Sequence, residues 1–426
     1  MFSTVGVKSG AFAGSGASSF GHIIFSGTLP PAGTILSPKD LASLLRPLGR
    51  KTRRRSLETA LAKAFEVPEV RLFSSGRAAM TVVLKAMAEL RPDRKTVIVP
   101  GYTCFSVPAS VVRAGLRVRP VEIDVNTLSY LPTALETACG PDVLCIVSGN
   151  LFGQPDDLVF LERFAKRQGA FFLDDAAQAF YATVDGRFAG AFGDAGILSF
   201  DKGKNITTIE GGAALLRNSE LADRIRPRWE ALTHPRTGAS AALVAKVLIY
   251  AALLRPRLYT LPARLLPLGG TPFEIDFPIM RYCEFLAPLA ASLLARIEEI
   301  TERRRTRARW LSEAVPATPH ITAPTASSDQ AVHLRFPLIL GNQTLRDHAL
   351  TELSSQGLGA AQFYPAALDE VPELEGFLDP AVPPTLNARS VARRILTLPT
   401  HEYVRPADVE KIGEILERVV RSPARI

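Results

Sequence analysis

The chain has 426 residues, 47% of them hydrophobic, and no low-complexity block. This length and composition predict a folded globular protein with room for two domains and a large core. Its four cysteines and six histidines show neither metal-ligand spacing nor a secretory disulfide pattern. We therefore expect no metal site and a cytoplasmic location, where thiols stay reduced.

The formal net charge of +8 is unevenly distributed, because Arg46, Arg50, Lys51 and Arg53–Arg55 crowd one stretch. Nucleic acid could bind such a cluster, but no aromatic residues are interleaved with it, and we expect no nucleic-acid partner. A solvated surface, or one that faces an anionic substrate or a membrane, is the preferred interpretation. The first 20 residues, rich in Gly, Ser and Ala, lack a signal-peptide apolar core and are expected to form a mobile leader.

The first predicted elements are a helix over 57–65, with Ser56 as its N-cap, and a strand over 70–73. The turn SSGRAAM, residues 74–80, then leads into a helix that ends near Leu90. Small residues before a helix start suit an anion, because free backbone amides and the helix dipole point toward it. An ordinary tight turn would show the same pattern, so the turn alone leaves both interpretations open.

Short apolar runs follow at 97–100, 117–123 and 143–147, with a predicted helix near 131–138. A further helix is expected to begin after Asp156 and Asp157 and to end near residue 166. This repeated alternation of strand and helix predicts a doubly wound, mostly parallel sheet.

Two more apolar runs end in groups that carry chemistry. Residues 170–173 are followed by Asp174 and Asp175, and residues 195–200 are followed by a segment that contains Lys204. Neighbouring parallel strands would deliver the carboxylate and the amine to one crevice at the carboxyl edge of the sheet. This pairing suits pyridoxal phosphate (PLP), whose ring nitrogen needs an acidic partner and whose aldehyde needs a lysine amine.

The region 173–212 resembles the PLP-dependent sugar aminotransferases of the DegT/StrS type, which are fold-type I aminotransferases. In that family an acid and Asp-Ala-Ala-Gln precede Ser-Phe, Lys-Asn and Glu-Gly-Gly in this order. The matching residues are Asp174, Asp175–Gln178, Ser199, Phe200, Lys204, Asn205 and Glu210–Gly212. The resemblance implies an α/β fold with a mostly parallel doubly wound sheet in a large domain, and a smaller C-terminal α/β domain.

The resemblance also implies the roles of the site residues. Lys204 would bear the cofactor and move protons, and Asp175 would keep the pyridine nitrogen protonated. Gln178 would lie against the cofactor's ring oxygen. The other cofactor-binding residues that it implies are Ser75, Gly76, Arg77, Tyr102, Cys104, Ser199 and Asn205.

Several positions depart from the family pattern. Arg77 stands where threonine is usual, Asn150 replaces a histidine, and Ile279 replaces an asparagine. Cys104 occupies the place of an aromatic that stacks on the cofactor ring, so Tyr102 or Phe105 would have to cover the ring, although either could equally be core.

Two further residues are assigned to the substrate side. Arg281 aligns with the arginine of a family loop that reaches the partner subunit's cofactor phosphate. Tyr364 matches a Tyr-Pro segment near the substrate, but the histidine that often follows is absent.

Residues 233–275 contain an apolar and basic insertion, where usual members of the resembling family have a shorter loop. The apolar run 241–254 is broken only by Lys246 and is too short to span a bilayer. We favour a packed helical hairpin or a dimer-interface element. A helix lying on a membrane, with Arg255, Arg257 and Arg264 at the headgroups, remains the alternative.

Residues 286–315 are expected to form one long helix with Arg303–Arg305 on its wet face. A shift in composition near residue 316 predicts a domain boundary. The predicted parts are therefore a leader and arm over 1–50, a large PLP-binding domain over 51–315 and a small domain over 316–426. The small domain should contain a strand at 332–340 and helices at 344–356 and 406–420.

The predicted function is transfer of an amino group from an amino acid, expected to be glutamate, to a nucleotide-linked keto sugar in glycan or amino-sugar biosynthesis. The expected enzyme is a homodimer, with peripheral membrane contact left open. A related dehydratase branch carries histidine in place of the lysine, and Lys204 argues against it. The alternative function is a catalytically idle PLP-binding regulator or membrane-associated scaffold of a polysaccharide pathway.

Overall fold

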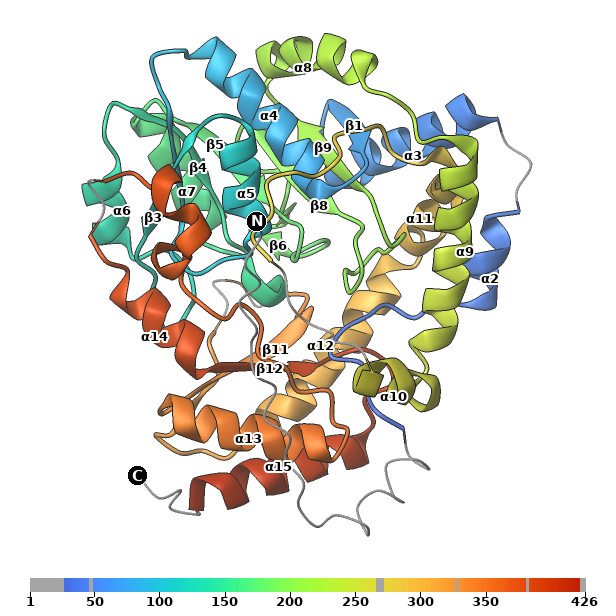
Figure 1. Cartoon of the computed structure of the whole chain (residues 1–426), viewed down its shortest axis with the longest axis vertical. Helices are drawn as coiled ribbons and strands as arrows, with labels where there is room; N and C mark the ends of the chain where they lie inside the picture. The colour runs from blue at the N-terminus through green and yellow to red at the C-terminus, as the bar shows by residue number, and fades with distance from the viewer. Residues whose placement is uncertain are drawn as a thin grey trace, which may run out of the picture.

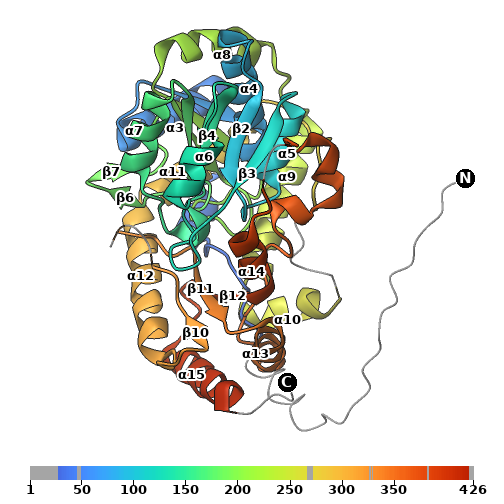
Figure 2. The ribbon, with the colours of Figure 1, turned by 90° about the vertical axis from the view of Figure 1, so that its left-hand side faces the viewer.

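A computed structural model of the chain describes residues 27–45, 49–265, 272–325, 328, 330–380 and 383–421. The expected leader and Arg46 lie outside the described residues. Figures 1 and 2 show a large sheet domain above a smaller one, with helix α12, Ile297–Ala314, running from the first into the second.

The large sheet has seven strands in the order β1-β9-β8-β5-β4-β2-β3. In chain order they are β1 Glu69–Phe73, β2 Thr96–Pro100, β3 Arg117–Val121, β4 Val143–Val147, β5 Phe171–Asp175, β8 Ala195–Ser199 and β9 Gly212–Leu216. The pairs from β8 to β3 are parallel, and β9 runs antiparallel to both β8 and β1. The prediction of a mostly parallel sheet is therefore confirmed.

Helices cover both faces of this sheet. The helices of the large domain include α3 Arg50–Phe65, α4 Gly76–Leu90, α5 Ser106–Arg113, α6 Pro132–Ala138, α7 Leu158–Arg167 and α8 Ser219–Ala231. Alternate residues of one strand enter two different cores: Phe172 packs with α3 and α7, whereas Phe171 and Leu173 pack with α4 and α5. This alternation is the period of two of a strand buried on both faces.

The small domain has its own three-stranded antiparallel sheet, β10-β11-β12. Its strands are β10 Ile321–Thr322, β11 Arg335–Leu340 and β12 Ile395–Pro399, and its helices are α13 Gln343–Ser355, α14 Leu386–Arg394 and α15 Pro406–Arg421. Ala308 and Leu311 of α12 lie in the same core as this sheet. The boundary at residue 316 stays a prediction.

Short elements complete the chain. They are the arm helix α2 Pro38–Ser43, the strand pair β6 Thr183–Val184 and β7 Arg187–Phe188, and the 3-10 turns η1 Leu151–Gly153, η2 Glu284–Leu286, η3 Leu368–Glu370 and η4 Pro372–Phe377. The other expected elements overlap helices or strands at their positions.

The start of the first expected helix was wrong. Helix α3 begins at Arg50, with Gly49 at its N-cap, so Ser56 is interior rather than a cap. The basic cluster is also less solvated than expected. The Cζ atom of Arg54 lies 4.8 Å from the centroid of the Trp229 ring, and the side chain is within 3.5 Å of Glu58.

The expected single helix over 286–315 is two helices, α11 Ala287–Leu294 and α12. The break falls at Arg296, whose guanidinium is held by the N-terminal arm: it donates to the Ile35 carbonyl at 2.6 Å and to Asp40 at 2.8 Å. The expectation of a wet face at 303–305 was wrong for Arg304, which is only 2% exposed. Sequence periodicity cannot detect an arm that covers a helix.

The insertion folds as two helices, α9 Thr237–Leu253 and α10 Pro256–Leu265. Figure 1 shows α9 along the flank of the molecule and α10 turned toward the small domain. Leu243, Val247 and Leu254 are buried at helical spacing, so one side of α9 packs on the body of the protein, while Leu248 and Ile249 stay exposed. The role of the insertion stays a prediction. Within the described ranges, no helix is both long and apolar enough to cross a bilayer.

Candidate active site

Two aspartates end strand β5, and Asp174 is the one that is fully hydrogen-bonded. Its carboxylate accepts from the Ser148 hydroxyl at 2.9 Å and from the Asn150 amide at 2.8 Å. The backbone amides of Gly190 and Phe192 donate to its other oxygen. Burial nevertheless raises the pKa of Asp174 to about 6. These bonds give Asp174 a structural role in holding the loop after β7.

Asp175 is different, because its carboxylate oxygens can accept further hydrogen bonds. It is 8% exposed, and among the described residues only the Ala177 amide, at 3.0 Å, donates to its carboxylate. Burial raises the pKa of Asp175 to about 6, against the opposite effect of the nearby positive charge of Lys204. The structure thus brings together the carboxylate and the amine that the two apolar runs predicted.

Lys204 lies in a tight turn after strand β8. Its backbone amide donates to the Asp201 carbonyl at 3.2 Å, and its side chain is partly exposed. The amide of Asn205 donates to the Phe180 carbonyl at 3.0 Å, while its buried Oδ1 has no partner in the described part of the chain. This bond fixes the backbone of the residue that directly follows Lys204.

The predicted anion site lies at the start of α4. Ser75 is its N-cap, and the hydroxyl accepts from the Ala78 amide at 3.1 Å. A Cβ on Gly76 would lie 3.2 Å from the Ser199 Cβ, and one on Gly212 would lie 2.4 Å from the Gly76 nitrogen. A side chain at Gly212 would force the backbone of α4 to shift, and one at Gly76 would be tight against Ser199. These close approaches place Ser199 beside the free amides of the first turn.

Arg77, at the same turn, carries its side chain toward the segment that begins at residue 272. One guanidinium nitrogen is 3.6 Å from Glu274, and Cζ lies 4.7 Å from the centroid of the Phe277 ring. A contact between Arg77 and the cofactor phosphate stays a prediction.

Gln178 connects the two domains. Its Oε1 accepts from the Phe152 amide at 3.1 Å, and its Nε2 donates to the Tyr364 hydroxyl at 3.2 Å. The Tyr102 hydroxyl accepts from the Tyr364 amide at 3.3 Å, so Gln178 and Tyr102 both hold Tyr364. Tyr364 therefore lies against two of the expected cofactor-binding residues.

The residue that would cover the cofactor ring is still a prediction. Tyr102 has no exposed surface, which favours a packing role. Phe105 is 6% exposed, and its ring centroid is 6.2 Å from that of Tyr364. Cys104 is partly exposed, with Sγ 2.8 Å from the Ser106 hydroxyl.

Asn150 has a role that sequence analysis missed. It adopts a left-handed conformation, φ 43°, which asparagine tolerates better than most residues. Its side-chain amide donates to the Asp174 carboxylate and, at 3.0 Å, to the Asp175 carbonyl, and its oxygen accepts from the Asp156 amide at 2.9 Å. Asn150 therefore fixes the end of β5, and its difference from the family's histidine does not leave a gap.

Arg281 pairs with Phe73 at the end of strand β1. Its Cζ is 4.3 Å from the centroid of the Trp229 ring, and it donates to the Trp229 carbonyl at 3.2 Å. It lines a pocket of about 510 Å³ together with Ser74, His234 and Lys246. A substrate contact of Arg281 stays a prediction.

Arg335, at the start of β11, is a second residue that sequence analysis missed. It is 8% exposed, and no carboxylate of the described residues pairs with it. Its Cζ lies 4.3 Å from the centroid of the Phe363 ring, and it donates to the Thr397 hydroxyl at 3.3 Å. Burial lowers the pKa of Arg335 to about 10, so it stays a cation at pH 7 beside Tyr364. The sequence pattern of a strand does not indicate that an arginine at its start is buried, so Arg335 could not be identified as a site residue from the sequence.

The residues present fit PLP. Asp175 can accept a hydrogen bond from a protonated ring nitrogen, Lys204 is close to it, and the start of α4 offers free amides to a phosphate. No cluster of three His, Cys, Asp or Glu residues able to hold a metal occurs in the ranges that the structure covers.

Comparison with known proteins gives the same family as the sequence motifs. The model of the DegT/DnrJ/EryC1/StrS aminotransferase family matches residues 46–242 and 279–417. A UDP-N-acetyl-3-dehydro-alpha-D-glucosamine 3-aminotransferase of Acidithiobacillus ferrooxidans is 25% identical over 376 residues, covering 86% of this chain and 88% of that protein. The Bacillus subtilis spore coat polysaccharide biosynthesis protein SpsC is 26% identical over 357 residues, covering 82% and 84%.

Solved structures share the fold. Helicobacter pylori PseC, an aminotransferase of pseudaminic acid biosynthesis, superposes with a TM-score of 0.73 at 17% identity, covering 92% of this chain and 99% of that one. An Escherichia coli GDP-4-keto-6-deoxy-D-mannose-3-dehydratase solved with hydrated PLP has a TM-score of 0.72 at 18% identity, covering 92% and 99%. Together with the family match over most of its length, these features show that the chain belongs to the DegT/DnrJ/EryC1/StrS family of PLP-dependent aminotransferases.

Proposed function

We propose that this aminotransferase moves an amino group from an amino acid, with glutamate as the expected donor, to a nucleotide-linked keto sugar in glycan or amino-sugar biosynthesis. The observation that carries the proposal is the buried Asp175 beside Lys204, in the family's order of motifs. The names of two relatives, a UDP-sugar aminotransferase and a coat-polysaccharide protein, support the substrate class.

When bound, PLP supplies the electrophilic carbon that exchanges amines and a ring that accepts the electrons of the donor's α-carbon. Asp175, whose pKa is about 6, is ionised at pH 7 and can hold the ring N–H. Lys204 would carry the proton between the donor's α-carbon and the cofactor. Asn150 keeps the carboxyl end of β5 in place, and Gln178 and Tyr364 close the site from the side of the small domain.

The first test is the visible absorbance of the purified protein with PLP, beside Lys204→Ala, before and after glutamate is added. We expect a band that requires Lys204 and is bleached by glutamate, with release of a keto acid. The acceptor is then sought among nucleotide-linked keto sugars, with the aminated product identified by mass spectrometry. A protein that forms no such band, or the same band without Lys204, would contradict the proposal.

The departures from the family pattern at Cys104, Asn150 and Ile279 would suit the alternative function, a PLP-binding scaffold without catalytic activity. Asn150 forms hydrogen bonds with Asp174, Asp175 and Asp156 that order the site. The replacement of histidine by asparagine at this position therefore does not indicate a loss of activity. Turnover with glutamate and a keto sugar separates the two functions.

We further propose that the enzyme is a homodimer and that the exposed side of α9 is buried in it. Across its 17 residues the helix carries one charge, Lys246, and Leu248 and Ile249 are 49% and 58% exposed. Contiguous apolar surface of this kind marks an interaction site. Replacing both residues with serine should increase the monomer fraction in sedimentation velocity. Unchanged dimers, combined with binding of the parent protein to anionic vesicles, would instead support membrane contact.

A further inference from the structure

The backbone of the lysine turn, residues 201–204, is held from two sides. From the N-terminal arm, the Thr34 hydroxyl donates to the Lys204 carbonyl at 2.8 Å. From helix α9, the Tyr250 hydroxyl accepts from the Gly203 amide at 3.3 Å. These two bonds are made to the lysine itself and to the residue before it.

Neither of the two contact residues falls within the match of the family model. The family model matches residues 46–242 and 279–417, so Thr34 precedes the matched region and Tyr250 lies in the unmatched insertion. The two contacts therefore lie outside the segments that the family model covers.

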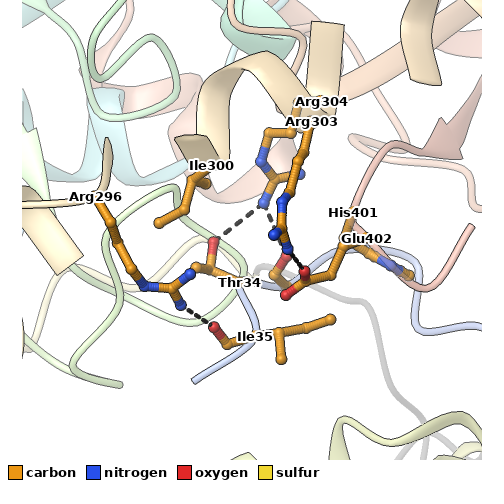
Figure 3. A pocket seen from close by; sticks show the side chains of 9 residues that line it. Thr34, Ile35, Arg296, Ile300, Arg303, Arg304, His401 and Glu402 are labelled. Atoms are coloured by element: carbon orange, nitrogen blue, oxygen red, sulfur yellow. Dashed lines mark hydrogen bonds and ion pairs between the residues drawn. The ribbon is translucent and has the colours of Figure 1, made fainter. Parts of the chain in front are cut away.

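The arm that carries Thr34 is itself anchored to the body of the protein (Figure 3). Arg304, buried in α12, donates to the Gly33 carbonyl at 2.8 Å and to the Thr34 hydroxyl oxygen at 3.1 Å. Arg296 donates to the Ile35 carbonyl at 2.6 Å. The Thr34 hydroxyl thus accepts from Arg304 while it donates to the lysine turn, and its orientation is set by both bonds.

The arm, the insertion and the lysine turn also meet without space between them. A Cβ built on Gly33 would lie 2.8 Å from Leu254 Cδ2 and 3.5 Å from the Tyr250 hydroxyl. A Cβ on Gly203, where φ is +79°, would lie 3.3 Å from the Ala32 Cβ. A shift of one of these segments must therefore move the others.

We propose that Thr34 and Tyr250 are positioning residues for Lys204, and that the arm and the insertion serve to clamp the turn that carries the catalytic amine. The inference rests on the proposed function, because it takes Lys204 as the residue that bears the cofactor. An amine that must exchange with the donor and then move a proton needs a fixed backbone, since small misplacements of a reacting group are costly in rate.

The first experiment measures amide hydrogen exchange of the protein without added PLP. In Tyr250→Phe and Thr34→Val, exchange in peptides covering residues 201–208 should be roughly 2- to 10-fold faster, the factor expected for one lost hydrogen bond. Thr260→Val, on the same insertion, and Thr28→Val, on the same arm, are the matched controls, because these two hydroxyls bond to each other and Thr260 also donates to the Pro256 carbonyl. Exchange rates in the two test variants equal to those of the controls would overturn the proposal.

The second measurement uses the PLP-loaded protein. The pH midpoint of its visible band should shift in Thr34→Val and Tyr250→Phe, and kcat for the glutamate half-reaction should fall roughly 2- to 10-fold with KM little changed. Thr34→Ser keeps the hydroxyl and should restore the parent midpoint. An unshifted midpoint in both test variants would overturn the clamp even if exchange is faster.

The two proposals can fail separately. Faster exchange at 201–208 in a protein that forms no lysine-dependent band would contradict the proposed function and leave the contacts of the turn confirmed. A lysine-dependent band with control-like exchange would support the proposed function and overturn the clamp.

Discussion

The two aspartates at the end of β5 have the same raised pKa, about 6, but opposite surroundings. Asp174 accepts four hydrogen bonds, two of them from the backbone amides of Gly190 and Phe192. Asp175 accepts one, from Ala177, as far as the described residues show. The Asp174 carboxylate therefore stabilises the fold, whereas the Asp175 carboxylate can still accept hydrogen bonds from a ligand.

Asp175→Asn should make the protein without PLP more stable at pH 8. The folded pKa of Asp175 is raised, so the folded chain keeps a proton that the unfolded chain releases between pH 4 and 6. Above pH 6 the buried charge therefore costs about 3 kcal/mol, which the neutral amide avoids. Urea unfolding at pH 8 should show this gain, and unfolding near pH 4 should not, while transamination is lost.

Asp174→Asn is the matched control for that substitution. Its amide NH₂ would face the donors Gly190 and Phe192, so it should destabilise the protein at pH 8. Equal effects of the two substitutions on stability would show that the difference in hydrogen bonding does not decide their roles.

Arg335→Gln should weaken the use of the amino donor. Arg335 is a buried cation without a carboxylate partner among the described residues, beside Tyr364 at the edge of the site. We expect it to bind the carboxylate of the amino acid, and a lost charged hydrogen bond corresponds to a rise of roughly 10- to 100-fold in KM for glutamate. Arg307→Gln in α12, whose side chain donates to the Val404 and Glu402 carbonyls, is the control, and an unchanged KM in Arg335→Gln would exclude this role.

At the scale of elements, the site depends on how closely strand β9 approaches the start of helix α4. Gly212 of β9 would place a Cβ 2.4 Å from the Gly76 nitrogen. The first amides of α4 keep their direction only while this contact is tight.

Gly212→Ala should therefore separate β9 from α4 and weaken PLP binding by roughly 10-fold or more, because misdirected amides no longer converge on a phosphate. Fluorescence titration with PLP would measure the change. Gly238→Ala in helix α9, where nothing lies within 4 Å of the added Cβ, is the control and should bind PLP normally. Normal PLP affinity in Gly212→Ala would place the phosphate elsewhere.

At the scale of the whole molecule, the N-terminal arm is fastened to the small domain by His401. Its Nε2 donates to the Pro30 carbonyl at 2.7 Å, and the ring is 4% exposed. Burial, with nearby Arg304, lowers the pKa of His401 to about 4, so the ring is neutral at pH 7.

His401 should make the arm sensitive to acid. Because its folded pKa is lowered, the unfolded chain binds a proton first, and stability falls by up to about 3 kcal/mol as pH drops from 6.5 to 4. His401→Gln keeps a donor for Pro30 but cannot protonate. We expect its unfolding free energy to change less over this range than that of the parent, and identical pH profiles would rule out His401 as the cause.

The sequence was sufficient for features that depend on local order. Asp175 and Lys204 come at or after the ends of two buried strands, and adjacent parallel strands end at one edge of a sheet, so their proximity could be predicted before the fold was known. The alternation of strands and helices likewise predicted the doubly wound large domain.

Only the tertiary structure decided which residues meet from distant parts of the chain. The helical pattern assigned Arg304 to solvent, and the arm covers it; Asn150 appeared to be a lost histidine, and it holds the end of β5. The insertion appeared to be an apolar hairpin, and through Tyr250 it reaches the lysine turn. The physical reason is that periodicity records which side of an element is buried, whereas the partner that buries it is set by packing and by hydrogen bonds between segments far apart in sequence.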